Sequence, residues 1–299
     1  MTMPLKISAA DLGTNTLKVT HAIRLPNGEL ADMVHASETV RLGFGIEQTG
    51  RIEQKRVDAC LAFLREQEAV AREYGSTEFI GVATEALRIA ANGEALLQRI
   101  HEETAWSVEI ISGDREAQLT YLGLKDMVPA ASDCAIVDIG GGSTEIVVIR
   151  DGVVTLQKSV PLGSGRLADR FFADDPPGED AQRSAIEAAR EALSAWTAQQ
   201  PQVPFIMLAG GSGLFMNQLI EQLFGKVPFS PDVLVKLAEH LATTHSSDTV
   251  DRINIPQARA LVLPASVAVG VAVMQNFGTE FAQGVPSGIR MGLIREFSS

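Results

Sequence analysis

Two short and similar segments stand far apart in this chain, and they constrain its fold more than any other feature. The first is Asp11-Leu12-Gly13-Thr14-Asn15-Thr16, and the second is Asp138-Ile139-Gly140-Gly141-Gly142-Ser143-Thr144. Each follows one apolar run and precedes another, so each is predicted to be the tip of a β-hairpin whose first strand ends in an acidic residue. Two such hairpins in separate halves of the chain indicate a duplicated domain.

The chemistry of these turns suits phosphate. Glycine allows positive φ, which turns successive backbone N–H groups toward one point. A concave set of N–H groups with hydroxyls beside it binds phosphate, and a nearby carboxylate can hold the accompanying Mg²⁺. On turn chemistry alone, ordinary structural turns remain the alternative. The candidate phosphate-binding residues of the two turns are Gly13, Thr14, Asn15, Thr16, Gly140, Gly141, Gly142, Ser143 and Thr144.

The length and composition indicate two globular domains. A chain of 299 residues with 45% hydrophobic and 21% charged residues can bury two separate cores. Pro129 and the small polar residues after it mark the most plausible boundary. We therefore predict an N-terminal domain over 1–127 and a C-terminal domain over 128–299. In the alternative arrangement, the last helix packs back on the first domain.

The charge balance argues against several classes of partner. The formal net charge of −12 disfavours general affinity for nucleic acid or for anionic membranes. It would also repel a phosphate-rich ligand at long range, so binding must depend on local amides, Mg²⁺ and a few cations. The most apolar stretch, 260–274, is shorter than a membrane span and is interrupted by Pro264 and Gly270, so we predict a buried helix.

The cysteines and the start of the sequence favour the cytoplasm. Cys60 and Cys134 are the only two cysteines, they lie far apart, and each has apolar neighbours. That pattern supports neither a disulfide framework nor a metal site. No export leader opens the sequence, so we expect a cytoplasmic location.

The remaining pattern alternates helices and strands. After the first hairpin we expect, in order, helix 51–74, strand 78–83, helix 86–100, strand 108–111 and helix 115–125. After the second hairpin we expect strand 153–160, helix 181–199, strand 205–209, and helices 232–243, 257–275 and 288–297. The strand at 205–209 ends in Gly210-Gly211-Ser212-Gly213, whose Gly211 and Ser212 are further phosphate-binding candidates.

Two phosphate hairpins followed by this third glycine-rich turn resemble the actin, hexokinase and Hsp70 superfamily, whose two halves close on a phosphorylated ligand. The resemblance implies an α/β fold of two ribonuclease-H-like (actin-like ATPase) domains with a central interdomain cleft.

Within that superfamily, the motifs resemble the exopolyphosphatase/guanosine pentaphosphate phosphohydrolase family in its short two-domain form. The resemblance covers essentially the whole chain. It is carried by residues 9–16, by 82–88 with Asn92, by Ile110-Ile111-Ser112-Gly113 with Glu116-Ala117, and by 137–145.

This resemblance implies Mg²⁺-dependent hydrolysis of a terminal phosphoanhydride bond, with water as the only acceptor. Inorganic polyphosphate is the favoured substrate, because no segment identifies a base-binding pocket; the 5′-phosphate of guanosine pentaphosphate is the other candidate. Family members often dimerise, so a homodimer is also expected.

The resemblance assigns the catalytic base to Glu116. A water that attacks phosphorus needs a carboxylate within hydrogen-bond reach, which a glutamate at a helix start can provide. On residue chemistry alone, the favoured role of Glu116 is that of an acidic residue in the first turn of a helix, and the family resemblance reverses this preference. Asp138 and Glu145 are implied metal ligands, with Asp11 as a third, and Arg88 is implied to face phosphate. Arg41, Arg166 and Arg290 are further cations that could meet a polyanion, with ordinary surface roles as the alternative.

Four residues depart from the family pattern: Arg115, Gln118, Leu214 and Met291. We expect Arg115 either to hold the base ionised or to contact phosphate itself. The departures bear on substrate choice more than on the class of reaction.

Two other functions stay open at this stage. One is an ATP-dependent small-molecule kinase of the same superfamily, which would need an acceptor pocket with an aspartate base. The other is a nucleotide- or polyphosphate-sensing protein with little turnover.

Overall fold

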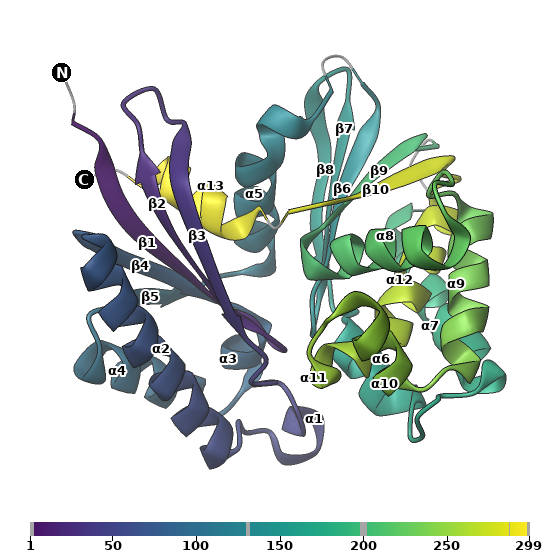
Figure 1. Cartoon of the computed structure of the whole chain (residues 1–299), viewed down its shortest axis with the longest axis horizontal. Coiled ribbons are helices and arrows are strands. Elements are labelled where there is room, and N and C mark those ends of the chain that lie inside the picture. Colours follow the sequence, from purple (N-terminus) through teal and green to yellow (C-terminus); the bar gives the residue numbers. More distant parts are fainter. Residues whose placement is uncertain (1–2, 130–131, 198–201, 287, 298–299) are drawn as a thin grey trace. The chain divides into compact units, whose positions relative to one another are not determined.

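A computed structural model describes residues 3–129, 132–197, 202–286 and 288–297 of the chain. The chain divides into two compact units, residues 1–127 with 287–299 and residues 128–286 (Figure 1). The C-terminal helix therefore belongs to the first unit, the arrangement that the sequence left as an alternative, and not to a second domain that runs to residue 299.

The first unit contains a mixed sheet. Its strands are β1 (Leu5–Leu12), β2 (Leu17–Arg24), β3 (Leu30–Glu38), β4 (Glu78–Ala83) and β5 (Ser107–Ile110). In the described residues the five strands lie in the order β3-β2-β1-β4-β5. β1 pairs antiparallel with β2 and parallel with β4, and β4 pairs parallel with β5.

Helices cover both faces of this sheet. They are α1 (Ile46–Thr49), α2 (Gln54–Tyr74), α3 (Glu85–Ile89), α4 (Gly93–Glu103), α5 (Gly113–Leu124) and α13 (Ile289–Glu296), with a short 3₁₀ turn at Lys125–Met127. Successive residues of β1 point to opposite faces. Ala10 and Leu12 join the core that includes α2 residues, whereas Ile7 and Ala9 pack with Ile294 of α13. Asp11 therefore lies on the α13 face.

The second unit repeats the same sheet order. Its strands are β6 (Cys134–Ile139), β7 (Thr144–Arg150), β8 (Val153–Val160), β9 (Phe205–Ala209) and β10 (Phe281–Val285). They lie in the order β10-β9-β6-β7-β8 in the described part of the chain, with β6 antiparallel to β7 and parallel to β9. Two units with one shared topology are what the duplicated hairpins predicted.

The helices of the second unit are α6 (Ser164–Phe171), α7 (Glu179–Thr197), α8 (Gly210–Phe224), α9 (Pro231–Thr243), α10 (Ser246–Ile253), α11 (Gln257–Ala260) and α12 (Leu263–Asn276). Every α12 residue from Leu263 to Met274 is buried. Residues 257–276 meet the length and composition of a membrane span, yet 78% of their apolar stretch is buried inside the protein. The predicted buried core helix is confirmed.

The structure divides two predicted helices and adds several elements. The helix predicted over 257–275 is α11 and α12, which are separated by a turn at Leu261 and Val262. The helix predicted over 86–100 is two helices, because the chain turns after Ile89. There the Asn92 side chain bonds both the backbone N–H and the carbonyl oxygen of Ile52, at 2.8 and 2.9 Å. A Cβ on Gly93 would lie 1.9 Å from the Leu87 carbonyl oxygen, so only glycine fits this bend. The strands β3 and β10 and the helices α1, α6, α8 and α10 had no counterpart in the sequence prediction.

The two cysteines form no disulfide, as predicted. Cys60 and Cys134 are both buried and free. Burial raises the pKa of the Cys60 thiol to about 12, so this group stays protonated at neutral pH.

Candidate active site

The predicted site residues of the first unit lie at one edge of its sheet, where the parallel strands β1, β4 and β5 end. The Asp11 to Thr16 turn follows β1, the Arg88 helix follows β4, and the Glu116 helix follows β5. The backbone joins these ends: the Thr84 N–H donates to the Leu12 carbonyl at 3.2 Å, and the Ile111 N–H donates to the Ala83 carbonyl at 3.0 Å. The carboxyl edge of parallel strands is where α/β folds place ligands.

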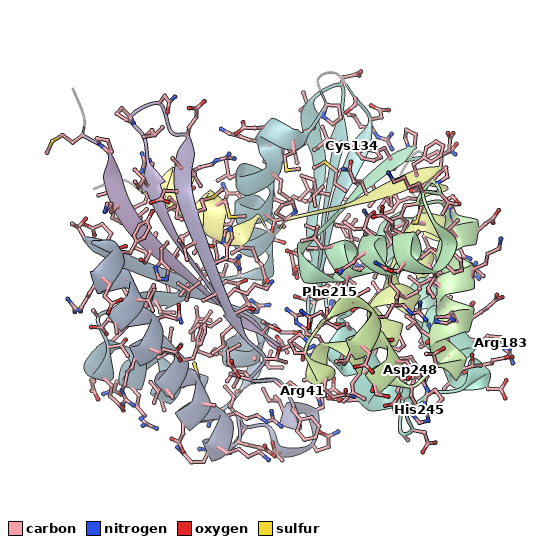
Figure 2. The ribbon with its side chains drawn as sticks, in the orientation of Figure 1. Arg41, Cys134, Arg183, Phe215, His245 and Asp248 are labelled. Carbon is pink, nitrogen blue, oxygen red and sulfur yellow. The ribbon has the colours of Figure 1, made fainter. Side chains whose placement is uncertain are left out.

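The loop that follows β3 holds the first turn from behind. The Arg41 N–H donates to the Asn15 carbonyl at 2.8 Å, and the Gly43 N–H donates to the Thr14 carbonyl at 2.9 Å. Gly43 eases this approach, because a Cβ there would lie 2.2 Å from the Thr14 side chain, which would have to rotate away. Arg41 itself has φ 55, so its backbone is left-handed beside the turn (Figure 2). The Thr14 and Asn15 carbonyls of the turn thus accept hydrogen bonds from the loop that follows β3.

Two buried oxygens in this turn lack a hydrogen bond. Asp11 Oδ1 and Thr16 Oγ1 are both shielded from solvent without a hydrogen-bond partner. The other Asp11 oxygen, Oδ2, lies 3.9 Å from Lys18 Nζ, the residue opposite Asp11 across the hairpin. Buried polar atoms are nearly always satisfied, so these two oxygens suit a ligand, a water molecule or a cation.

Glu116 occupies the first turn of α5. The Ser112 side chain caps this helix by accepting from the Arg115 N–H at 3.2 Å, and the Glu116 N–H donates to the Ser112 carbonyl at 3.0 Å. Only 8% of the Glu116 side chain is exposed. The N-terminal end of a helix favours a negative charge, so the fold stabilises a carboxylate at this position.

Arg88 lies beside Glu116, and the structure brings these two predicted residues together. Arg88 Nη1 donates to the Ile111 carbonyl at 2.6 Å and lies 4.0 Å from Glu116 Oε2. With 29% of its side chain exposed, the guanidinium is fixed at one end and still accessible. Arg88 can therefore hold the Glu116 carboxylate and still face an anion.

The second turn is built like the first. A Cβ on Gly140 would lie 2.9 Å from the Ser143 carbonyl oxygen, and a Cβ on Gly13 would lie 2.8 Å from the Thr16 carbonyl oxygen. The N-terminal end of α6 holds this turn from behind, because Ser164 and Gly165 donate their N–H groups to the Gly140 and Gly141 carbonyls at 2.9 and 2.8 Å. The Thr144 hydroxyl donates to the Leu162 carbonyl, so it is used within the protein.

Gly163 permits the close contact between α6 and this turn. A Cβ at Gly163 would lie 2.4 Å from backbone atoms of Gly141 and Gly142, whereas the close contact of a Cβ at Gly43, at 2.2 Å, would be with the Thr14 side chain. A side chain can rotate away, but backbone cannot yield without reshaping the turn.

We therefore predict that Gly163→Ala lowers the free energy of unfolding by about 1–3 kcal/mol, the usual cost of overpacking. The affinity of the second turn for phosphate should also fall in Gly163→Ala, because the new Cβ displaces the backbone N–H groups of the turn. Gly43→Ala is the matched comparison and should be milder. Denaturant unfolding and ligand titration of both variants check this; equal effects on stability would contradict it.

Asp138 and Glu145 face each other across the second hairpin. They are directly opposite in the β6–β7 register, and both are buried. Glu145 Oε1 accepts from the Ser143 and Ser159 hydroxyls, each at 2.7 Å. Like charges directly opposite on a sheet are destabilising, so this pair is suited to a cation between or beside the two carboxylates.

The third glycine-rich turn is packed tightly against Asp138. Gly210 has φ +81, and a Cβ there would lie 3.0 Å from Asp138 Oδ1. The Ser212 hydroxyl donates to the Ile139 carbonyl at 3.1 Å, so it ties this turn to the end of β6. Gly211 lies beside Phe215 of α8 (Figure 2) and beside Arg259, whose Nη2 would be 3.6 Å from a Cβ on Gly211.

The structure places two predicted cations elsewhere. Arg115 does not hold Glu116: its guanidinium pairs with Glu296 and Gln118, and the ion pair with Glu296 raises the Arg115 pKa. Arg290 is buried, and its Nε donates to the Thr20 hydroxyl at 2.6 Å. Arg166 donates its backbone N–H to the Gly141 carbonyl at 3.2 Å, so it does border the second turn.

Two cations near the turns were missed by the sequence reasoning. Arg56 lies 4.7 Å from the Phe44 ring, whose other neighbour is Arg41 at 4.8 Å, and it donates to the Val40 carbonyl at 2.7 Å. Arg259 lies beside Gly211. Neither belongs to a motif, and only the folded chain brings them to the turns.

Among the described residues, no three His, Cys, Asp or Glu side chains converge as a ready-made metal site. Mg²⁺ commonly takes one or two carboxylates and completes its shell with water and phosphate oxygens. The Asp138–Glu145 pair and the buried Asp11 oxygen have the oxygen chemistry that this mode of binding requires.

Comparison with known proteins gives a consistent result. The model of the Ppx/GppA phosphatase family matches residues 23–298. Exopolyphosphatase 1 of Mycobacterium bovis is 28% identical over 306 residues, which cover 97% of this chain and 87% of that protein. Exopolyphosphatase 1 of Mycobacterium leprae is 26% identical, with 97% and 88% covered.

Solved structures agree on the fold. The crystal structure of the Aquifex aeolicus member of the Ppx/GppA family superposes with a TM-score of 0.78 and 25% identity, covering 98% of this chain and 97% of that one. An exopolyphosphatase from Cytophaga hutchinsonii gives a TM-score of 0.84 at 22% identity, covering 97% and 96%. With the shared sheet order, this confirms the predicted fold class of two ribonuclease-H-like, actin-like domains.

Proposed function

Because this chain belongs to the Ppx/GppA phosphatase family, we propose that it is an exopolyphosphatase that hydrolyses the terminal phosphoanhydride bond of inorganic polyphosphate. The observation that carries the proposal is the buried Glu116 carboxylate, held beside Arg88 at the carboxyl edge of the first sheet. The curated relatives named exopolyphosphatase support polyphosphate as the substrate.

In this proposal Glu116 is the general base. Its carboxylate accepts a proton from a water molecule as the water oxygen bonds to the terminal phosphorus. The bond between that phosphorus and the bridging oxygen then breaks, and the shortened chain leaves with the bridging oxygen as a phosphate oxygen. General-base catalysis of this kind contributes about 10²–10⁴-fold to a rate.

Arg88 and the turns supply charge and position. The Arg88 guanidinium keeps the Glu116 carboxylate in place and offers its remaining donors to a phosphate oxygen. The N–H groups of Gly13 to Thr16 and of Gly141 to Ser143 are candidates for binding the phosphates, because the loop after β3 and the start of α6 bond carbonyls of the two turns; the Gly140 N–H, also a candidate from the sequence, donates to the Ser143 carbonyl at 2.9 Å instead. Phosphoryl transfer depends mainly on such positioning and charge stabilisation.

We further propose that Mg²⁺ is the cofactor, held by Asp138 and Glu145 with Asp11 as a further ligand. When bound, Mg²⁺ neutralises phosphate charge and stabilises the developing charge of the transition state. The Ser143 and Ser159 hydroxyls orient Glu145 by donating to one of its oxygens. The positive charge of Mg²⁺ would also offset, at the site, the net charge of −12, which would otherwise oppose a polyanionic substrate.

Guanosine pentaphosphate is the second candidate substrate. Phe215 and Arg259 beside Gly211 are the observation that favours it, because an aromatic ring and a guanidinium are groups that stack on or bond to a purine. The two substrates share the same terminal bond chemistry, so one enzyme can accept both.

The test is phosphate release by the purified protein from long polyphosphate, short polyphosphate and guanosine pentaphosphate, each with Mg²⁺ and with a chelator. We expect release from polyphosphate that requires Mg²⁺. No release from any of the three substrates would refute the hydrolase, and release that persists in chelator would refute the cofactor alone.

A further inference from the structure

Arg115, Gln118 and Glu296 form a cluster at the start of the Glu116 helix. Arg115 Nη1 donates to Glu296 Oε1 at 3.0 Å and to Gln118 Oε1 at 2.8 Å, and Arg115 Nη2 donates to Glu296 Oε2. The Arg115–Glu296 pair is therefore bidentate, the geometry in which a guanidinium fixes a carboxylate most firmly. It joins the first turn of α5 to the last residue of α13.

The rest of α13 lies directly on α5. A Cβ on Gly292 would lie 2.0 Å from the Leu119 carbonyl oxygen, and a Cβ on Gly288 would lie 2.2 Å from the Thr120 carbonyl oxygen. Glycines thus let the two helix backbones touch. Arg295 adds hydrogen bonds to the Leu122 and Gly123 carbonyls at 2.8 and 3.0 Å, at the C-terminal end of α5.

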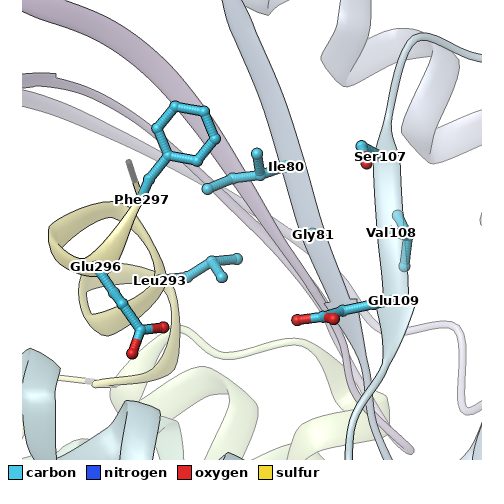
Figure 3. A pocket seen from close by; sticks show the side chains of 8 residues that line it. All are labelled: Ile80, Gly81, Ser107, Val108, Glu109, Leu293, Glu296 and Phe297. Carbon is cyan, nitrogen blue, oxygen red and sulfur yellow. The ribbon is translucent and has the colours of Figure 1, made fainter. Parts of the chain in front are cut away.

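Near the end of α13, Leu293 and Phe297 pack with Ile7 and Ala9 of β1 and also border a pocket. A pocket of about 260 Å³ lies between the end of α13 and the strands β4 and β5, lined by Ile80, Val108, Leu293 and Phe297 (Figure 3). Glu296 and Glu109 also line it, so the Glu296 carboxylate sits between Arg115 and an unfilled space. Arg24 also holds this end of α13, by donating to the Phe297 carbonyl, and the Arg115–Glu296 pair links it to the first turn of α5, which carries Glu116.

We propose that Glu296 is a positioning residue for the reaction: through Arg115 it fixes the first turn of α5 and thereby the direction of the neighbouring Glu116 carboxylate. The inference rests on the proposed role of Glu116 as base. It gives a physical role to Arg115 and Gln118, two of the four residues that depart from the family pattern, and it makes the C-terminal helix part of the catalytic apparatus.

The pair contributes to position more than to stability. Arg115 is 29% exposed and Glu296 is 38% exposed, and partly exposed ion pairs contribute little to folding. A small displacement of a catalytic group costs far more, because misplacement by about 1 Å can lower a rate about 10²-fold. The two effects can therefore be separated by experiment.

The experiment compares Glu296→Gln with Glu103→Gln, which removes a half-buried carboxylate paired with Arg99 and Arg65 in the same unit. For Glu296→Gln we expect kcat for polyphosphate to fall at least about tenfold while KM changes less than about twofold. Glu103→Gln should match the wild type. The exchanged pair, Arg115→Glu with Glu296→Arg, should recover most of the lost kcat, which a general loss of stability would not allow.

A second readout does not depend on activity. The Glu116 N–H, which donates to the Ser112 carbonyl, should exchange its hydrogen faster in Glu296→Gln than in the wild type. Unchanged kcat, unchanged exchange at Glu116, or no recovery in the exchanged pair would each overturn the proposal. If the wild type releases no phosphate, the proposed function fails, and the exchange measurement alone decides whether Glu296 fixes the turn.

Discussion

Replacing Glu116 by glutamine is expected to lower kcat for phosphate release by about 10²–10⁴-fold, the range of general-base catalysis. Glutamine keeps the size of the side chain and can still lie beside Arg88, but it cannot accept the proton of the attacking water. KM should change little, because Glu116 acts on water and not on the phosphate chain.

The matched control for this variant is Asp114→Asn. Asp114 lies two residues earlier in the first turn of the same helix and is exposed. The Asp114→Asn substitution also removes one negative charge from this end of the helix, so it shows how much of any change in kcat comes from the loss of charge alone. We expect wild-type kcat and an unchanged melting temperature for Asp114→Asn. A Glu116→Gln protein that is folded and as active as the control would exclude Glu116 as the base.

The second large effect is expected at the Asp138–Glu145 pair. Glu145→Gln should lower activity by about two orders of magnitude, in line with the several kcal/mol that a metal-held charge supplies to such a reaction. The variant should also need more Mg²⁺ for half-maximal rate, because a neutral amide is a weaker ligand than a carboxylate.

The same substitution has an opposite effect on stability. Glu145→Gln removes one of two like charges that face each other across buried strands, so without Mg²⁺ its melting temperature should rise or stay level. The wild type should gain more stability from added Mg²⁺ than the variant does. Glu187→Gln, on an exposed position of α7, is the control for loss of one charge in the same unit. Equal Mg²⁺ stabilisation of Glu145→Gln and the wild type would remove Glu145 from the metal site.

The sequence predicted those features that depend on local patterns. Both hairpin turns, the buried strand β4 and the buried core helix follow from runs of apolar residues and from glycine chemistry. These patterns depend only on residues that are neighbours in the sequence. The turn after Ile89 was missed because the bonds that fix it join Asn92 to Ile52, 40 residues away. Local periodicity carries no information about such a partner.

The site shows the same division. Glu116, Arg88 and the turn glycines belong to motifs, whereas Arg56 and Arg259 reach the turns only through folding. Arg115 shows that residues adjacent in the sequence need not interact in the fold. Its neighbour in sequence is Glu116, yet its guanidinium bonds Glu296, 181 residues away, because the helix directs adjacent side chains to different sides. Adjacency to Glu116 in the sequence was therefore a poor guide to the contacts of Arg115.

The most direct measurement of the central claim is the fate of the oxygen from water. The protein would be incubated with polyphosphate and Mg²⁺ in water enriched in ¹⁸O, and the released orthophosphate would be analysed by mass. Hydrolysis of the terminal bond by water predicts one ¹⁸O atom in each released phosphate during the first turnovers, and none in Glu116→Gln, which should release almost no phosphate. Phosphate without the label would contradict attack of water on the terminal phosphorus, and a phosphoryl group recovered on another acceptor would contradict the hydrolase and favour a kinase.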